Sequence, residues 1–368
     1  MLFNLFKSKE EKKKSSQYLS LKVREVVKET ADTVTLYFEQ PEPYLDYKPG
    51  QFLTVILDIN GQEERRSYSL CTSPYVDPYP GITVKRVKEG LISNYLNDQI
   101  RPGKTIEIMK PMGHFTLDFH SQNKRHYVMV TGGSGITPIM GITKSVLVNE
   151  PNSEVTLLYC SRSEEQIIFN DELAALEDKY PGKLRVIHNL TQPSESWTGL
   201  KGRIDADRIK GFLIKNVYPE AEKVKYFSCG PEGLMDTTLA TLKNLGVDKE
   251  NILKESFYTA TSGKVEDAGM EIEDTPTLTR EVKIVLEGQD FGFEVLPDQT
   301  ILEAGLEKDI DMPYSCQSGL CTACRGKLVS GEVKMEEDAG LSENEIQEGY
   351  VLCCVSHPMS GNVKISIE

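Results

Sequence analysis

Five of the eight cysteines lie close to the C-terminus, between positions 316 and 354. Three of them have the spacing Cys316-x4-Cys321-x2-Cys324, and the adjacent Cys353 and Cys354 follow after a long interval. Thiolates with this first spacing hold two irons in one class of [2Fe–2S] site. Spacing alone does not choose which of the last two cysteines supplies the fourth thiolate. The pattern predicts an iron–sulfur centre that carries one electron, and a structural zinc site is the less favoured alternative.

A glycine-rich segment in the middle of the chain has the features of a phosphate-binding turn. It follows the apolar run Tyr127–Val130, which predicts a short strand, and it precedes a helix expected to start at Pro138. Gly133 and Gly135 would let backbone amides approach a pyrophosphate at the start of that helix. Thr137 completes the turn, and a proline suits the first position of a helix.

A second turn of this kind follows the predicted strand Val224–Ser228. Its residues Cys229, Gly230 and Pro231 lie directly before another expected helix, Glu232–Leu245. The carboxyl ends of parallel strands meet at one edge of an open sheet, where such sheets bind ligands. We therefore expect both turns to border one dinucleotide site.

The N-terminal third contains two segments suited to a flavin. In the first, Arg66 can pair with a phosphate and Tyr68 offers a flat ring for stacking, with Ser69 directly after it. The second has a glycine and a serine at a predicted helix start, a combination that can surround an anion. The candidates in this second segment are Lys85, Val87, Gly90 and Ser93.

The elements expected around these residues fall into three groups. Residues 17–118 contain short β-rich runs such as Phe52–Ile59, separated by Pro and Gly, which indicates an antiparallel barrel or sandwich. From about 119 to 258, strands alternate with helices, which predicts a parallel sheet with helices on both faces. Residues 259–278 have the composition of a linker, and a third unit follows them.

Charge is distributed unevenly along the chain. The whole sequence has a net charge of −14, and residues 279–368 alone contain 7 basic and 17 acidic side chains. Such acidity argues against nucleic-acid binding and favours docking onto a basic protein surface. The first 16 residues combine Leu and Phe with several Lys, which allows weak membrane contact, although a frayed basic end is the simpler interpretation. No apolar run approaches the ~18 residues of a spanning helix, and the start is too short for an export signal, so we expect a cytoplasmic protein.

The cysteine-rich unit resembles plant-type ferredoxins. The segment from Pro313 to Gly326 is similar to their cluster loop, and Val351–Val355 is similar to their closing Leu-x-Cys element. This resemblance selects Cys354 as the fourth ligand and implies a β-grasp α+β fold. Cys353 would then point the opposite way along a strand and belong to the core.

Residues 18–258 resemble the ferredoxin–NADP reductase-like superfamily. The resemblance implies that Glu255 and Phe257 lie beside a flavin, and that Ser69 and Glu255 orient or tune the reacting end of its ring. Four motifs of that superfamily occur in the same order here, namely Arg-x-Tyr-Ser at Arg66–Ser69, Gly-x-x-Ser at Gly90–Ser93, Gly-x-Gly-x-x-Pro at Gly133–Pro138 and Cys-Gly-Pro at Cys229–Pro231.

A ferredoxin unit behind such a reductase resembles the reductase components of oxygenase systems, most nearly the reductase subunits of phenylacetyl-CoA epoxidases. This implies FAD, NAD(P)H and a [2Fe–2S] cluster, because a nicotinamide gives two electrons as hydride, the cluster takes one, and a flavin can divide the pair. Pro111–Phe115 resembles the FAD-using branch rather than the FMN-using phthalate dioxygenase type. The implied partner is a separate terminal oxygenase or epoxidase, and the alternative is a membrane acyl-lipid desaturase or hydroxylase.

The choice of nicotinamide nucleotide depends on the residues after the predicted strand Val155–Cys160. Arg162 can pair with a 2′-phosphate, which favours NADPH, whereas Glu164 and Glu165 would favour the free 2′-hydroxyl of NADH. We favour NADPH.

The sequence as a whole predicts a multidomain protein with three folded units of different class. Their predicted boundaries are a basic tail over 1–16, an antiparallel β-barrel that binds FAD over 17–118, an α/β parallel-sheet domain that binds NAD(P) over 119–258, a linker over 259–278 and a β-grasp [2Fe–2S] ferredoxin domain over 279–368.

Overall fold

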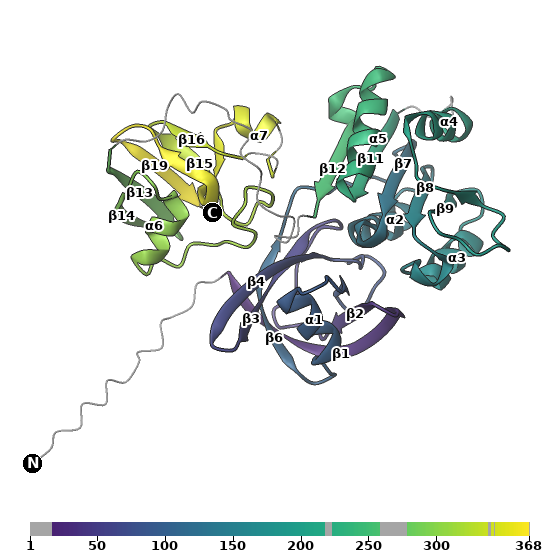
Figure 1. The fold of residues 1–368 in the computed structure, drawn as a ribbon, viewed down its shortest axis with the longest axis horizontal. Helices are drawn as coiled ribbons and strands as arrows, with labels where there is room; N and C mark the ends of the chain where they lie inside the picture. Colours follow the sequence, from purple (N-terminus) through teal and green to yellow (C-terminus); the bar gives the residue numbers. More distant parts are fainter. Residues whose placement is uncertain (1–16, 218–222, 258–277, 338–339, 342, 368) are drawn as a thin grey trace, which may run out of the picture.

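The computed structural model describes residues 17–217, 223–257, 278–337, 340–341 and 343–367. The predicted basic tail, and all of the predicted linker except Leu278, lie outside these residues. Three main sheets organise the described part of the chain, and Figure 1 shows them as three separate bodies. Among the described residues, no helix has both the length and the apolarity needed to cross a membrane.

The first sheet has six antiparallel strands in the order β4-β3-β6-β1-β2-β5. An isolated bridge between Leu70, directly after β4, and Ile82 of β5 brings the two edges together, so the sheet curls into a barrel. Its interior is filled by aliphatic side chains, and the predicted antiparallel barrel is confirmed. The elements are β1 (Tyr18–Thr30), β2 (Thr33–Phe38), β3 (Phe52–Ile59), β4 (Gln62–Ser69), β5 (Gly81–Lys85), α1 (Leu91–Asp98) and β6 (Thr105–Met112).

Strand β4 forms although its sequence is almost entirely polar. Asn60 and Gly61 both have positive φ, 58° and 82°, and connect Ile59 of β3 to Gln62 of β4. A two-residue turn with two positive φ angles matches the right-handed twist of a hairpin. The turn therefore fixes the register of β4, and the flavin motif at its C-terminal end is placed by turn chemistry rather than by apolar alternation.

The second sheet has six parallel strands in the order β10-β9-β8-β7-β11-β12. Helices lie on both faces, as predicted, with one apolar core on each side of the sheet. Helix α2 starts at Ile136, so Pro138 is its third residue and not its first. The first turn of a helix still tolerates proline, because its N–H groups have no intrahelical partner. The strands are β7 (Arg125–Gly132), β8 (Glu154–Ser161), β9 (Leu184–Leu190), β10 (Leu200–Lys201), β11 (Lys223–Gly230) and β12 (Ile252–Ser256), and the helices are α2 (Ile136–Asn149), α3 (Asn170–Lys179), α4 (Ala206–Asn216) and α5 (Glu232–Asn244).

The barrel and the parallel sheet share one apolar core. Cys71 and Phe115 come from the barrel part of the chain but are buried among residues of the parallel sheet. The ring of Phe115 packs edge-on against Phe227, with 5.4 Å between centroids. Gly50 allows this arrangement, because a Cβ there would overlap the carbonyl oxygen of Phe115.

The third sheet is mixed and has the order β14-β13-β19-β15-β17. Strands β13 and β19 are parallel, and the other neighbours are antiparallel. Helix α6 packs on the sheet and begins with a capping box between Thr300 and Glu303. The elements are β13 (Arg280–Leu286), β14 (Gln289–Val295), α6 (Ile301–Glu307), β15 (Arg325–Ser330), β16 (Val333–Met335), α7 (Glu343–Gln347), β17 (Tyr350–Leu352), β18 (Ser356–Pro358) and β19 (Val363–Ile367).

Candidate electron-transfer site

The structure brings the four predicted cluster cysteines together. Interactions with the thiols of Cys321 and Cys354 lower the pKa of Cys316, while interactions with the thiols of Cys316 and Cys324 raise the pKa of Cys354. Cys353 is fully buried in the apolar core. The predicted strand at this point is wrong, because Cys353–Val355 forms a 3-10 turn.

Backbone amides surround these thiols. The N–H of Ser318 donates to Cys316 Sγ at 3.4 Å, and the backbone of Gly319 and of Ala323 donates to Cys354 and Cys321. Gly319 has φ +72°, and a Cβ there would lie 2.7 Å from Glu337. N–H groups directed at sulfur stabilise negative charge, so four thiols with this donor set fit a [2Fe–2S] cluster.

The two predicted nucleotide turns interlock at the carboxyl edge of the parallel sheet. A Cβ on Gly135 would lie 2.3 Å from the carbonyl oxygen of Cys229, so only glycine fits this approach. Thr131 Oγ1 donates to the same carbonyl at 2.7 Å. Gly133 has φ +54°, and the space beside its Cα is open. These features fit a turn that presents its backbone to a pyrophosphate.

Tyr159 supports this turn and was not predicted from the sequence. Its hydroxyl donates to the carbonyl oxygen of Gly133 at 3.0 Å, and the ring is fully buried. The backbone N–H of Ile168 donates to the same hydroxyl at 3.3 Å. A tyrosine within an apolar strand gives no sequence signal for such a contact.

Arg162 lies directly after β8 and is exposed. The two acidic residues that follow have other partners: Glu164 accepts from Ser194 Oγ at 2.5 Å, and Glu165 accepts from Ser163 Oγ at 2.7 Å. Within the described ranges, the Arg162 side chain makes no hydrogen bond or ion pair. The cation is therefore available to a ligand, while each of the two carboxylates already accepts a serine hydroxyl.

The flavin motif meets the parallel sheet through Ser69. Its hydroxyl donates to Glu255 Oε2 at 3.1 Å. Burial raises the pKa of Glu255 to about 8, and the Ser69 hydrogen bond acts in the opposite direction. Glu255 is also in register with Cys229 of β11, and Phe257 follows β12 with an exposed side chain. Ser69 of the flavin motif therefore lies, through Glu255, at the end of β11 that carries Cys229 of the second nucleotide turn.

The second flavin segment forms a compact turn before α1. The Val87 N–H donates to Ser93 Oγ at 3.1 Å, and the Gly90 N–H donates to the Val87 carbonyl at 3.0 Å. Lys85 lies 3.7 Å from Asp32. In the first segment Arg66 is exposed and lies 3.4 Å from Glu64, while burial raises the pKa of Tyr68.

Strand β4 also contacts the cysteine-rich sheet. Ser67 Oγ donates to Ser315 Oγ at 2.8 Å, and Ser315 directly precedes the predicted cluster cysteine Cys316. The Arg65 guanidinium lies 4.0 Å above the ring of Tyr314. These contacts are long-range, and no motif in the sequence signals them. Ser67 and Ser69 are two positions apart and therefore share one face of the strand, so the same face of β4 contacts both neighbouring units.

A second contact between these units lies at the other end of the cluster loop. Arg325, which follows the cysteine Cys324, lies 2.5 Å from His114 Nε2 and donates to Glu345 at 2.6 Å. Burial, followed by the nearby Arg325 charge, lowers the pKa of His114. The neutral imidazole can therefore accept from the guanidinium.

Models of three protein families match the chain in order. Residues 19–117 match an oxidoreductase FAD-binding domain, residues 129–239 an oxidoreductase NAD-binding domain, and residues 284–359 a 2Fe-2S iron-sulfur cluster binding domain. FAD, a nicotinamide nucleotide and a [2Fe–2S] cluster are thus the cofactors of this chain, as predicted.

Curated relatives cover almost the whole chain. A subunit of 1,2-phenylacetyl-CoA epoxidase from Escherichia coli (strain K12) is 34% identical over 95% of this chain and 97% of its own length. The ferredoxin reductase component of 3-ketosteroid-9-alpha-monooxygenase from Rhodococcus rhodochrous is 36% identical over the same shares. Among solved structures, phthalate dioxygenase reductase matches with a TM-score of 0.58 and 25% identity, over 95% of this chain and 98% of that one.

These relatives serve separate oxygenases, which supports the predicted oxygenase partner, and none of the three is named for a desaturase. Predicted membrane contact rested on residues 1–16, which lie outside the described residues. The chain belongs to the family of oxygenase reductase components, oxidoreductases in which an FAD-binding domain, an NAD-binding domain and a 2Fe–2S domain transfer electrons to a terminal oxygenase.

Proposed function

We propose that this chain takes hydride from NADPH and supplies single electrons to an epoxidase of the phenylacetyl-CoA type. When bound, FAD accepts hydride and releases electrons singly, and the [2Fe–2S] cluster carries one electron at a time. The observation that carries the proposal is the double contact of β4: Ser69 reaches Glu255 on the nucleotide side, and Ser67 reaches Ser315 beside the cluster loop.

The proposed roles come from the family resemblance, and the contacts described above support them. Ser69 and Glu255 hold and tune the reacting end of the flavin ring, with Phe257 beside it. The cluster ligands are Cys316, Cys321, Cys324 and Cys354. FAD is held by Arg66, Tyr68, Ser69, Lys85, Val87, Gly90 and Ser93, and the nucleotide by Gly133, Gly135, Thr137, Pro138, Arg162, Cys229, Gly230 and Pro231.

The preference for NADPH rests on Arg162. Its exposed guanidinium is available, while Ser194 and Ser163 engage the neighbouring carboxylates. Loss of a charge-assisted contact of ~1.5–3 kcal/mol would weaken NADP⁺ binding by about 10- to 100-fold. Arg162→Ala should show this loss in calorimetric titration, with NAD⁺ binding unchanged. Arg185→Ala, an exposed arginine at the other end of the sheet, is the matched control. Equal binding of both nucleotides to the wild type would contradict the preference.

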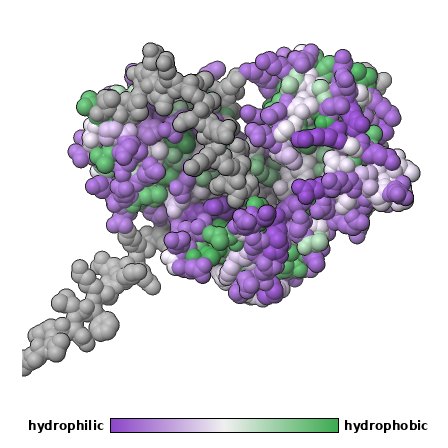
Figure 2. Space-filling model, in the orientation of Figure 1, coloured by the Kyte–Doolittle hydropathy of each residue, from purple (hydrophilic) through white to green (hydrophobic). Residues whose placement is uncertain are grey.

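The epoxidase partner is supported by the match to the phenylacetyl-CoA epoxidase component over nearly the whole of both chains. The acidity of residues 279–368 suits a basic docking surface on that partner. On the face shown in Figure 2 the surface is mostly hydrophilic, with hydrophobic residues in small separate groups, which fits a polar interface.

The eight cysteines form no disulfide, which fits a reducing cytoplasm.

The partner assignment can be tested by reconstitution. NADPH oxidation by the purified chain should increase when the catalytic components of a phenylacetyl-CoA epoxidase and its substrate are added, and epoxide should form. The terminal component of a 3-ketosteroid monooxygenase is the comparison acceptor. Faster turnover with that component would redirect the proposal to a steroid system, and no stimulation by either would refute both.

A further inference from the structure

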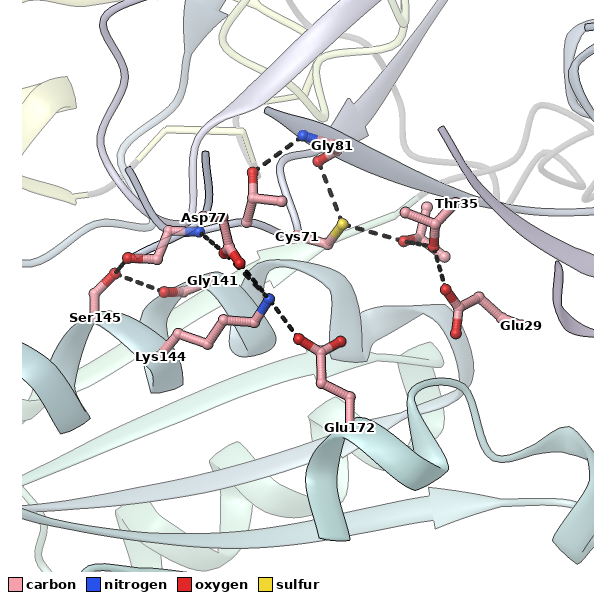
Figure 3. Close-up of polar contacts among 12 residues, drawn as sticks. Glu29, Thr35, Cys71, Asp77, Gly81, Gly141, Lys144, Ser145 and Glu172 are labelled. Carbon is pink, nitrogen blue, oxygen red and sulfur yellow. Dashed lines mark hydrogen bonds and ion pairs between the residues drawn. The ribbon is translucent and has the colours of Figure 1, made fainter. Parts of the chain in front are cut away.

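Helix α2 contacts both halves of the hydride-transfer site. Its first turn follows the nucleotide turn at Gly133–Gly135. Its later turns lie against residues 70–77, which directly follow the flavin motif and are called the flavin segment below (Figure 3). The contact at Gly141 is between backbones: a Cβ there would lie 2.8 Å from the Thr72 carbonyl oxygen and 3.1 Å from that of Leu70. The helix therefore has little freedom to approach the flavin segment more closely.

One turn later, Lys144 joins three elements. Its side chain is buried, and Nζ lies 3.1 Å from Asp77 Oδ2 and 2.7 Å from Glu172 Oε1 (Figure 3). Asp77 belongs to the flavin segment, whereas Glu172 belongs to α3 of the nucleotide domain. The neighbouring Ser145 Oγ lies 2.7 Å from Ser73 Oγ of the flavin segment. Lys144 thus connects the two domains through Asp77, and it connects α2 to α3 through Glu172.

The surroundings keep Lys144 charged and in place. A buried lysine is rare unless it is paired, and burial alone would lower its pKa. The carboxylates of Glu172 and Asp77 outweigh that effect and raise it. Ion pairs of this kind contribute little net stability, but they can favour one arrangement of the groups over others. The nearby Glu29 accepts from Thr35 Oγ1 at 2.7 Å, so a separate donor satisfies that carboxylate.

We propose that Lys144 is a positioning residue for hydride transfer, and that its pair with Asp77 fixes the angle at which α2 brings the nucleotide turn to the flavin segment. The inference rests on the flavin and nucleotide positions proposed above. In this step a hydride, two electrons and one proton, passes from NADPH to oxidised FAD and leaves NADP⁺. Reacting atoms must lie within about 3–3.5 Å, and a displacement of ~1 Å can cost ~100-fold in rate.

A matched pair of substitutions separates the cross-domain contact from the internal one. Asp77→Asn breaks the pair between domains but keeps an acceptor for the Ser73 N–H, which donates to Asp77 at 2.7 Å. Glu172→Gln breaks only the pair within the nucleotide domain. Both variants are studied as full chains loaded with FAD and cluster. In anaerobic stopped-flow mixing with saturating NADPH, flavin reduction should slow about tenfold in Asp77→Asn. In Glu172→Gln its rate should stay within about twofold of the wild-type rate.

Hydrogen exchange gives a readout independent of turnover. Residues 70–77 should exchange faster in Asp77→Asn and at the wild-type rate in Glu172→Gln, with equal FAD content in both. Gly141→Ala changes no charge but pushes α2 from the flavin segment, so it should reproduce the slow reduction and serves as the test if Asp77→Asn does not fold.

The inference is overturned if Asp77→Asn reduces flavin at the wild-type rate, if Glu172→Gln slows it equally, or if only NADPH affinity changes. Failure of the proposed function gives a different result, because the wild-type flavin would then not be reduced by NADPH at all.

Discussion

The barrel meets its two neighbours in different ways. Against the nucleotide domain it shares an apolar core through Cys71 and Phe115, and Lys144 adds a buried ion pair. Against the ferredoxin domain it makes polar and cation–π contacts, as between Ser67 and Ser315 or Arg65 and Tyr314. The core of the ferredoxin domain, within the residues described, draws all its buried members from residues 282–367 of that domain.

This difference matches the two transfers that the family performs. Hydride transfer moves an atom and needs a fixed, short separation, which a shared core provides. Single-electron transfer does not require the reacting atoms to touch. Polar interfaces between domains allow relative motion more readily than large apolar ones. The first interface therefore suits a permanent arrangement, and the second suits a contact that can open when the cluster meets its oxygenase.

The largest expected effect tests whether electron transfer through the cluster can be lost while hydride transfer to the flavin is kept. Cys354→Ser should remove the cluster and slow the transfer of electrons to cytochrome c, used as a test acceptor. The rate should fall by more than the ~10–100-fold that is typical when only a hydrogen-bond partner of a metal ligand is lost. Flavin reduction by NADPH should stay near the wild-type rate. Iron and acid-labile sulfide analysis, with the visible spectrum, measures the loss.

Its matched control is the adjacent buried cysteine. Cys353→Ser should keep iron, sulfide and electron transfer, and should lower stability by ~1–3 kcal/mol because a hydroxyl enters an apolar core. If Cys353→Ser loses the cluster and Cys354→Ser keeps it, the ligand assignment is wrong.

The next effect concerns the Arg65 guanidinium, which lies above the ring of Tyr314. Arg65→Met removes an interaction of ~1–2 kcal/mol, which corresponds to about a tenfold decrease in the docked population. Cluster reduction by the flavin should slow accordingly, while flavin reduction by NADPH should not change. Stopped-flow traces at flavin and cluster wavelengths separate the two steps.

Arg24→Met is the control for this substitution, because Arg24 lies 4.1 Å above Tyr79 in a similar stack within the barrel region. Equal slowing in both variants would show that the effect arises from the barrel and not from ferredoxin docking.

A smaller effect is expected on the hydride side from Glu255. Its pKa is raised to about 8, so the carboxyl is neutral below that pH and ionised above it. The folded chain holds this proton more tightly than the unfolded chain. The stability that the protonated Glu255 carboxyl contributes is therefore lost as pH rises toward 8. A new negative charge beside the flavin should slow its reduction about fivefold, for an interaction near 1 kcal/mol.

The pH profile of flavin reduction, from pH 6 to 9.5, measures this effect. Glu255→Gln should give a flat profile near pH 8 with FAD still bound. A step that persists in Glu255→Gln belongs to another group and would remove Glu255 from the tuning role.

Local signals in the sequence predicted the parts of the proposed site but not their assembly. The cysteine spacing and the glycine turns were predictable because each depends on residues close together in the chain. Strand β4 was missed because it is polar and depends on the Asn60–Gly61 turn and on pairing with β3. The helix α4 was also missed, although Ile209, Phe212 and Leu213 form a buried face with helical spacing.

The contacts between domains had no sequence signal at all. Ser67 and Ser315 are 248 positions apart, and a serine pair has no distinctive spacing. Lys144, Asp77 and Glu172 are ordinary surface residues by type, and only the tertiary fold buries Lys144 and brings the two carboxylates to it. The roles of Ser69 and Glu255 came from a family resemblance, and the structure adds the 3.1 Å contact between them.

The smallest expected effect examines the hydrogen bond between Ser67 and Ser315 by a double-mutant cycle. Ser67→Ala and Ser315→Ala should each slow cluster reduction about two- to threefold, since we expect this neutral hydrogen bond to contribute ~0.5 kcal/mol, the low end of the usual range. The double variant should slow it no further than either single variant, because both remove the same bond. Additive effects would mean that the two hydroxyls are not in contact during electron transfer. Such additivity would break the comparison at its weakest point, because it would place the reactive ferredoxin pose elsewhere on the barrel while leaving the nucleotide side unchanged.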